Sequence, residues 1–216
     1  FSDILFAVSD LSEKNLTKYK KRKKIIKTGN TIIDSSLIAY KKAKTNRKRK
    51  KIKNYALINI HRHENINDKE RLQKIIDILK AVKIKALWPI HANTAKAIEK
   101  FGFVGDVKSI KNLKLMSLTD YFGFIFLLAN CKYLVTDGGS IQEESLVVKK
   151  PCIILRKRTE RQEGLKTGIN FLTKLNVNYS RKIIKEIENN NYKIKKFKNP
   201  YGEKGVSKKI VNYLLR

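Results

Sequence analysis

Hydrophobic residues in this chain occur in short runs that alternate with segments in which they recur every three or four positions, so strands and helices are predicted in turn. Strands are predicted at Tyr55–Ile60, Ile84–Ile90, Leu113–Met116, Tyr133–Val135, Cys152–Leu155 and Ile169–Leu172. Helices are predicted from Asn67 or Asp68, from Asn93, over Asp120–Asn130, after the glycines at 138 and 139, and near Thr159–Lys166. This alternation predicts an α/β fold: a Rossmann-like parallel sheet with helices on both faces.

The first part of the chain is less regular. Ile4–Val8 is predicted to be a strand, and Ser9 to cap a helix that follows it. Ile25 and Ile26 predict a second short strand, and a helix follows the turn at Gly29. The basic run Lys41–Lys53 has few apolar residues, which is typical of a loop or a frayed helix end.

Polar residues with binding chemistry stand just after the predicted strands. In a parallel sheet, ligands collect at the carboxyl ends of the strands. His61 and Arg62 follow the first of the six strands, His91 follows the second, and Arg161 follows the fifth. We therefore expect these side chains along one edge of the sheet.

Thr136–Glu144, with the sequence TDGGSIQEE, joins a strand to a helix through Gly138 and Gly139. Such a turn brings backbone N–H groups and a helix start to a phosphate, and carboxylates one turn later can accept bonds from sugar hydroxyls. The alternative is an ordinary strand-to-helix turn with two solvated glutamates, Glu143 and Glu144.

Four segments together carry a resemblance: YALINIHRHEN at Tyr55–Asn65, TDGGSIQEE, RKRTERQEG at Arg156–Gly164 and NPYG at Asn199–Gly202. In this order and spacing they resemble the non-hydrolysing UDP-N-acetylglucosamine 2-epimerases. The resemblance implies the C-terminal domain of a GT-B arrangement with a remnant of the N-terminal domain. Residues 1–45 would be that remnant and the interdomain crossover, 46–200 the UDP-binding domain, and 201–216 a helix that packs back on the N-terminal domain.

The resemblance also implies the roles of the residues. His61 would be the catalytic residue beside the diphosphate. The residues matched to UDP-sugar binding are Arg62, Phe124, Gly138, Gly139, Ser140, Glu143, Glu144 and Arg161. Glu144 would hold the ribose and Phe124 would lie at the uracil, while His91 would shape the site. The alternatives are purely structural roles: His61 and Arg62 would bond to backbone groups at the strand end, and Phe124 would be a core residue.

Three positions depart from the family pattern. His63 stands where a second arginine is common, so any role of that arginine is in doubt. Ser140 follows the two glycines, whereas the family serine precedes them. Gln162 replaces a usual proline, which predicts a less rigid loop.

The implied reaction interconverts UDP-GlcNAc and UDP-ManNAc, for polysaccharide precursors, by eliminating UDP and adding it back. The acid and base groups of the family lie mainly in the domain not represented here. No metal or nicotinamide cofactor is implied, and the full-length family implies a homodimer. A GT-B glycosyltransferase or a hydrolysing epimerase with the same UDP site is the alternative.

The composition suggests an alternative function of another class, nucleic-acid binding. The chain has 49 Lys and Arg against 19 Asp and Glu, a net charge of +30, concentrated in runs at Lys18–Lys27 and Lys41–Lys53. Such a surplus is typical of nucleic-acid-binding proteins. However, stacking aromatics are absent from these runs beyond Tyr19, so we expect only nonspecific binding that salt abolishes.

The remaining features indicate a compartment. The longest apolar stretch, Phe122–Ala129, is far shorter than the ~20 residues that a membrane-spanning helix needs, so no membrane association is expected. Cys131 and Cys152 fall beside or within predicted buried strands, which is typical of free thiols in a reducing, cytoplasmic setting.

Overall fold

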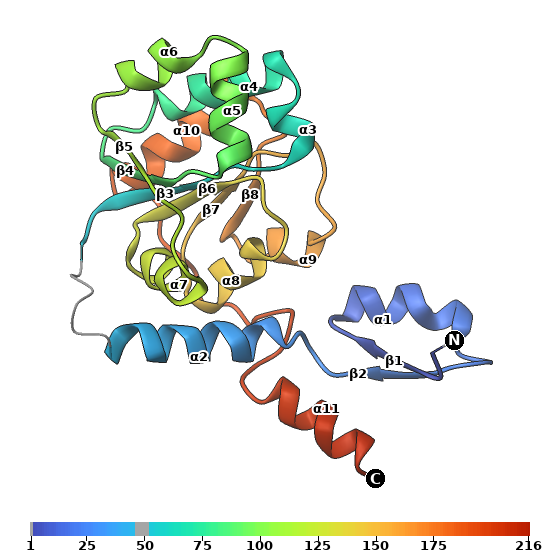
Figure 1. Ribbon diagram of the computed structural model, residues 1–216. Helices are drawn as coiled ribbons and strands as arrows, with labels where there is room; N and C mark the ends of the chain where they lie inside the picture. The colour runs from blue at the N-terminus through green and yellow to red at the C-terminus, as the bar shows by residue number, and fades with distance from the viewer. Residues whose placement is uncertain (1, 46–51) are drawn as a thin grey trace.

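A six-stranded parallel sheet forms the centre of the computed structural model, which describes residues 2–45 and 52–216 (Figure 1). Its strands lie in the order β5-β4-β3-β6-β7-β8. Their bounds are Tyr55–Asn59 for β3, Lys85–Pro89 for β4, Leu113–Met116 for β5, Tyr133–Thr136 for β6, Cys152–Ile154 for β7 and Asn170–Leu172 for β8. All six predicted strands are confirmed, and so is the predicted α/β fold class.

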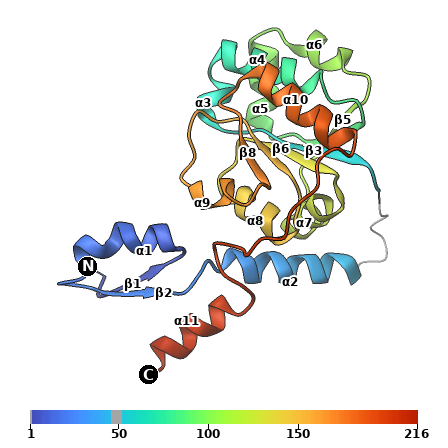
Figure 2. The same ribbon diagram turned by 180° about the vertical axis from the view of Figure 1, so that it is seen from behind.

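Helices cover both faces of this sheet (Figures 1 and 2). One face carries α3 (His63–Ile66), α4 (Lys69–Leu79), α5 (Ala92–Lys100), α6 (Val104–Ser109) and α10 (Val177–Glu188); the other carries α2 (Ile32–Thr45), α7 (Tyr121–Asn130) and α8 (Ile141–Val147). Ile58 packs into the first layer and its neighbour Leu57 into the second, both fully buried. Burial on two faces explains why the strands read as continuous apolar runs.

The N-terminal part forms a separate pair of parallel strands, β1 (Ile4–Ala7) and β2 (Lys24–Lys27). Helix α1 (Asp10–Leu16), followed by a short 3-10 turn at Thr17–Tyr19, lies between them along the chain. Ser9 caps α1 as predicted, because its hydroxyl accepts the Ser12 N–H at 3.1 Å. The predicted strands here are confirmed.

Helix α2 is longer than its sequence pattern indicates. It runs to Thr45, so the loop or frayed end predicted from Lys41 onward is wrong for the first five residues of that basic run. Ala39 and Ala43 are buried on one side of the helix, and the packing of these two side chains stabilises the helical conformation of the lysine-rich turn. Residues 46–51 of the run lie outside the described part of the chain.

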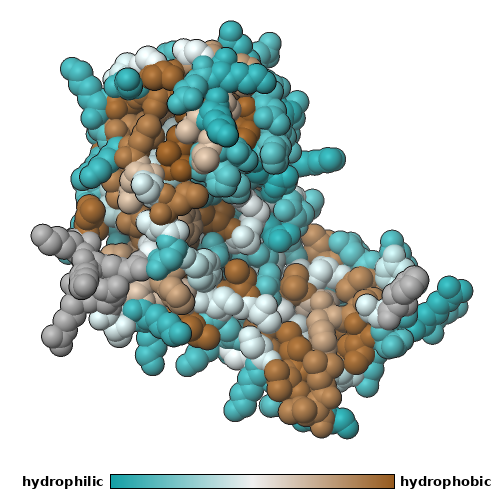
Figure 3. Space-filling model, viewed as in Figure 1, coloured by the Kyte–Doolittle hydropathy of each residue, from teal (hydrophilic) through white to brown (hydrophobic). Residues whose placement is uncertain are grey.

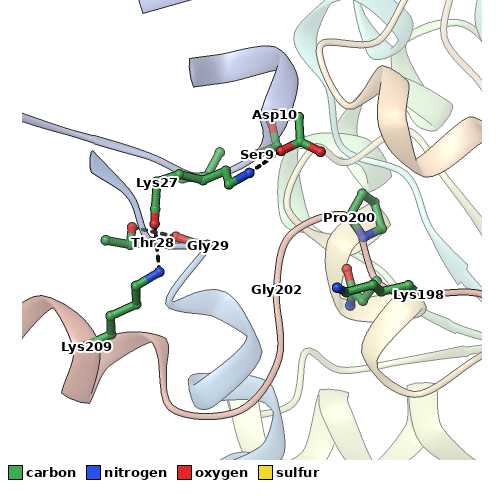
Figure 4. Close-up of a pocket in the computed structure, with 11 residues that line it drawn as sticks. Ser9, Asp10, Lys27, Thr28, Gly29, Lys198, Pro200, Gly202 and Lys209 are labelled. Carbon is green, nitrogen blue, oxygen red and sulfur yellow. Dashed lines mark hydrogen bonds and ion pairs between the residues drawn. The ribbon is translucent and has the colours of Figure 1, made fainter. Parts of the chain in front are cut away.

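The C-terminal helix α11 (Val206–Leu214) lies against the β1–β2 pair. The rings of Tyr213 and Phe6 meet edge-on with centroids 5.9 Å apart, and Lys209 Nζ donates to the carbonyl of Lys27 at 2.7 Å (Figure 4). Apolar side chains also gather on the outer surface of α11 in Figure 3, where Leu214 is 57% exposed.

Two segments cross between the β1–β2 part and the six-stranded domain. Asn30 N–H donates to the carbonyl of Tyr201 at 2.8 Å, and Gly29 and Gly202 both have positive φ values, +94° and +102°. Beside this crossing lies a pocket of about 410 Å³, and Lys27, Lys198 and Lys209 are among the residues that line it (Figure 4). No helix in the described ranges is both long and apolar enough to cross a bilayer.

Gly29→Ala tests how much the crossing contributes to stability. A Cβ at this position would lie 2.7 Å from the Tyr201 carbonyl oxygen, on backbone at φ +94°, so the free energy of unfolding should fall by roughly 2 kcal/mol or more. Urea unfolding followed by circular dichroism measures this. Gly105→Ala is the control, because a Cβ added there on helix α6 would meet nothing within 4 Å, and a loss as large at that position would contradict the argument.

Candidate functional site

The strand order reverses between β3 and β6. The chain passes from β3 outward to β4 and β5, and then returns to β6, which pairs with the other side of β3. Asn59 and Thr136 are register partners at the carboxyl ends of these two strands. In a doubly wound sheet the crevice at such a reversal is where ligands bind, so the segments that continue from these two residues build the site.

Asp137 joins the two strand ends. Its fully buried carboxylate accepts the backbone N–H groups of His61 and Arg62, each at 3.0 Å, and the side-chain amide of Asn65 at 3.0 Å. The pattern of the sequence did not single out Asp137. The available signal was a carboxylate placed directly between a buried strand and a glycine pair.

His61 stands over this carboxylate. Its Nδ1 lies 3.6 Å from Asp137 Oδ1, beyond hydrogen-bond distance, and its side chain is 46% exposed. The ring of His91 lies 6.5 Å away, centroid to centroid. The structure thus brings His61 and His91 together from the ends of β3 and β4.

The glycine turn is constrained by packing. A Cβ on Gly138 would lie 2.8 Å from the Ile141 side chain, and one on Gly139 would lie 3.2 Å from Glu160 Oε1. Gly138 N–H donates to Thr136 Oγ1 at 2.9 Å, and the adjoining Ser140 is exposed at the start of α8. The glycines therefore allow close contact between the turn and its surroundings.

Glu143 is buried and shared by two segments. It is 2% exposed, and its Oε1 accepts the Asn30 side-chain amide at 2.9 Å and lies 2.9 Å from Arg161 Nε. Burial raises the pKa of Glu143, and the charge of Arg161 opposes that rise. Arg161 is thus placed by an ion pair with the first acidic residue of α8.

Glu144 is also buried, at 5% exposure, but it has a neutral partner. Its Oε1 accepts the hydroxyl of Tyr121, from α7, at 3.0 Å. Burial raises the pKa of Glu144, and the hydrogen bond from Tyr121 opposes the rise. The alternative interpretation of Glu143 and Glu144 as solvated glutamates is therefore wrong.

Gln142 connects the glycine turn to the loop that carries Arg161. Its side-chain amide donates to the Gly138 carbonyl at 2.7 Å, and its Oε1 accepts the Thr159 hydroxyl at 2.8 Å. Sequence reasoning missed this residue, because a glutamine inside a helix start has no distinctive pattern. Gln162 begins the short helix α9 (Gln162–Leu165).

The other predicted residues have varied surroundings. Phe124 is half-buried and packs against the core on the α7 side. Arg62 extends toward Glu64, with 3.5 Å between Nε and Oε1, and His63 is exposed. Cys131 and Cys152 are buried free thiols.

The donor groups of the site suit some ligands better than others. Within residues 2–45 and 52–216, no three His, Cys, Asp or Glu side chains are grouped so that they could hold a metal ion. The described site offers buried carboxylates, a partly exposed histidine beside one of them, arginines and a close-packed glycine turn. This set is suited to hydroxyls and phosphates.

The sequence matches the profile described as UDP-N-acetylglucosamine 2-epimerase over residues 1–215. A UDP-N-acetylglucosamine 2-epimerase of Methanocaldococcus jannaschii is 35% identical, over 99% of this chain and 61% of the relative. A UDP-N-acetylglucosamine 2-epimerase homolog of Methanococcus maripaludis is 34% identical, over 99% of this chain and 60% of the relative.

Solved structures agree. The crystal structure of the M. jannaschii UDP-GlcNAc 2-epimerase in complex with UDP-GlcNAc and UDP matches with a TM-score of 0.87 and 33% identity, over 99% of this chain and 61% of that one. The Neisseria meningitidis enzyme bound to UDP-GlcNAc matches with a TM-score of 0.76 and 28% identity, over 99% and 61%. This chain therefore spans about 60% of the length of the relatives it matches. It belongs to the UDP-N-acetylglucosamine 2-epimerase family.

Proposed function

We propose that this chain carries the nucleotide-binding part of an enzyme that interconverts UDP-GlcNAc and UDP-ManNAc. The observation that carries the proposal is the buried carboxylate pair, Glu143 and Glu144, beside the glycine turn at the point where the strand order reverses. Two charged groups buried side by side lower stability, which is typical of residues retained for binding. The M. jannaschii relative solved with UDP-GlcNAc and UDP supports the same ligand class.

The nucleotide would be held by groups from several strand ends. Glu144 would exchange its bond from Tyr121 for bonds from the ribose hydroxyls, and Phe124 would contact the uracil. Gly139 and Ser140 would approach the diphosphate with backbone N–H groups, and Gly138, whose own N–H donates to Thr136 Oγ1, would let the turn come close to it. Arg161, held by Glu143, and Arg62 would supply positive charge, while His91 would shape the wall beside His61.

His61 would act where the bond from the sugar to UDP breaks. Elimination takes the proton from C2 and releases UDP as the C1–O bond breaks, and re-addition returns a proton to the opposite face. A histidine close to the Asp137 carboxylate can stabilise or protonate the leaving diphosphate. The groups that remove and return the C2 proton would come from the facing N-terminal domain.

The arrangement of domains belongs to the same proposal. Residues 1–45 would be the end of the N-terminal domain and the crossover, 46–200 the UDP-binding domain, and 201–216 a helix returning to the N-terminal domain. The contact between α11 and β2 supports this division. A homodimer and a cytoplasmic location of the full-length protein are further expectations from the family.

UDP binding by the chain alone is the first test. UDP should bind weakly and raise the melting temperature at millimolar concentration, because the glycine turn, Glu144 and Arg161 all lie here. Glu144→Gln should weaken UDP on the order of tenfold, since it removes charge-assisted hydrogen bonds to the ribose. The exposed Glu99→Gln is the control. Absence of any stabilisation by UDP would refute the nucleotide site.

Glu144→Gln should weaken UDP binding but make the folded protein more stable. Because burial raises the folded-state pKa of Glu144, the folded protein binds this proton more tightly than the unfolded chain does, and stability is lost as pH rises through that folded-state pKa. Glu144→Gln should therefore raise the free energy of unfolding at pH 7 by about 1 kcal/mol and have less effect near pH 4. Urea unfolding at both pH values measures the difference, and a destabilised variant at pH 7 would contradict it.

Epimerase activity should require more than this chain. Without acid and base groups opposite His61, each worth about 10²–10⁴ in rate, residues 1–216 should not convert UDP-GlcNAc measurably. Joined to the N-terminal domain of a relative, the chain should become active, and His61→Ala should remove most of that activity. Product analysis and exchange of the C2 proton in D₂O are the measurements. Exchange by the isolated chain would show that the catalytic groups are misplaced.

A further inference from the structure

Asn30 lies just before α2, where the chain crosses from β2 into the six-stranded domain. Its backbone N–H donates to the Tyr201 carbonyl at 2.8 Å, which ties it to the second crossing segment. Its Oδ1 accepts the Ile32 N–H at 3.0 Å, and its Nδ2 donates to Glu143 Oε1 at 2.9 Å. The two ends of one side-chain amide therefore connect the beginning of α2 to a carboxylate of α8.

The partners of this amide fix its orientation. A backbone N–H can only donate, so the amide oxygen must face Ile32, and an ionised carboxylate can only accept, so the amide nitrogen must face Glu143. The backbone is fixed as well, because Gly29, directly before Asn30, lies so close to the second crossing that a Cβ would be 2.7 Å from the Tyr201 carbonyl oxygen. The amide is thus held in one place and in one orientation.

The carboxylate that Asn30 contacts also places Arg161. Glu143 Oε1 lies 2.9 Å from Arg161 Nε, but this Nε makes no hydrogen bond to any residue that the structure describes, so charge and not a directed bond holds the pair. The bond from Asn30 to the same oxygen is directed. Burial raises the pKa of Glu143, and the charge of Arg161 and the hydrogen bond from Asn30 oppose the rise. Asn30 therefore both orients the carboxylate and favours its ionised form.

The segment just after Arg161 is also contacted from outside the six-stranded sheet. The Ser9 hydroxyl donates to Glu163 Oε1, and the Tyr201 hydroxyl donates to Glu163 Oε2 at 3.5 Å. The Arg161 side chain is 31% exposed, so its guanidinium can still reach a ligand. Its position thus depends on contacts that come from the two crossing segments and from the β1–β2 part.

We propose that Asn30 is a positioning residue of the UDP site, which holds Glu143 so that the guanidinium of Arg161 faces the diphosphate. The inference rests on the proposed function, because Arg161 needs a defined position only if it meets an anion. The alternative is that Asn30 only closes the turn at the start of α2 and contributes to folding. Variants that keep this turn separate the two roles.

Asn30→Ser keeps an acceptor for the turn, but its side chain is too short to replace the amide donor at Glu143. It should weaken UDP binding by residues 1–216 on the order of tenfold, measured by NMR titration at about pH 7.5. In the Arg161→Gln background the same change should weaken UDP less than about twofold further, because the residue through which Asn30 acts is gone.

Asn176→Ser is the matched control. Asn176 Oδ1 accepts the Tyr179 N–H at 2.8 Å, so this asparagine also closes a turn at a helix start, that of α10. The control variant should bind UDP within about twofold of the wild type. A loss as large as that of Asn30→Ser would show that any weakened helix start disturbs the site, and it would overturn the proposal.

Asn30→Asp adds a measurement that a purely structural role would not change. Aspartate closes the turn as asparagine does, but the new carboxyl faces Glu143. At about pH 5 the two carboxyls share a proton, and the protonated one donates to the other as the amide did. The ratio of variant to wild-type Kd for UDP should lie within about twofold there and rise to the order of tenfold near pH 8, where that proton is lost. In the Arg161→Gln background this rise should disappear, whereas direct repulsion of UDP by the new charge would persist and contradict the proposal.

The outcomes also separate this inference from the nucleotide site itself. If the wild type binds UDP and both Asn30 variants bind it equally well, Asn30 positions nothing and the nucleotide site stands. Equal losses in the wild-type and Arg161→Gln backgrounds would likewise overturn the proposal. No UDP binding by the wild type would refute the nucleotide site and this inference with it. Circular dichroism checks the fold of each variant, and if Asn30→Ser does not fold, the isosteric Asn30→Asp carries the test at both pH values.

Discussion

The crevice depends on the hydrogen bonds that the carboxylate of Asp137 accepts. This carboxylate is fully buried at the reversal of strand order and accepts three hydrogen bonds, two from the backbone after β3 and one from Asn65. Asn65 in turn donates to the carbonyl of Leu155, at the end of β7. One side chain therefore fixes three adjacent strand ends relative to each other. Removing it would leave several buried donors without acceptors, at about 1–3 kcal/mol each.

Buried carboxylates recur around this point, and each has a different kind of partner. Asp137 is satisfied by neutral donors, Glu143 by Arg161 and an amide, and Glu144 by a tyrosine hydroxyl. These differences matter for ligand exchange. A neutral hydroxyl such as that of Tyr121 can be replaced by a sugar hydroxyl at small cost, whereas the donors of Asp137 are built into the backbone.

Sequence reasoning predicted the sheet because its strands are apolar on both faces and are separated by capped helices. It failed where tertiary contacts decide the outcome. Helix α10 was not predicted, although Ile183, Ile184 and Ile187 carry its buried face, and α2 extends into a lysine-rich segment because Ala43 is buried. The residues at the strand ends could be selected from their positions, and Asp137, directly after β6 and before the glycine pair, offered the same signal. Gln142 could not be selected, since its importance lies in bonds to the Gly138 carbonyl and the Thr159 hydroxyl that no sequence pattern indicates.

The charge of the chain acquires a different meaning once it is placed in the fold. A net charge of +30 suggested a polyanion partner, yet the cation that is buried in the described part of the chain is Arg156, at the carboxyl edge of the sheet. Lysines such as Lys18 and Lys41 remain exposed, where salt screens them. Burial makes the difference, because a charge removed from water must find a partner and a charge in water need not. Anionic ligands are therefore expected at this edge, where Glu160 lies between Arg156 and Arg161.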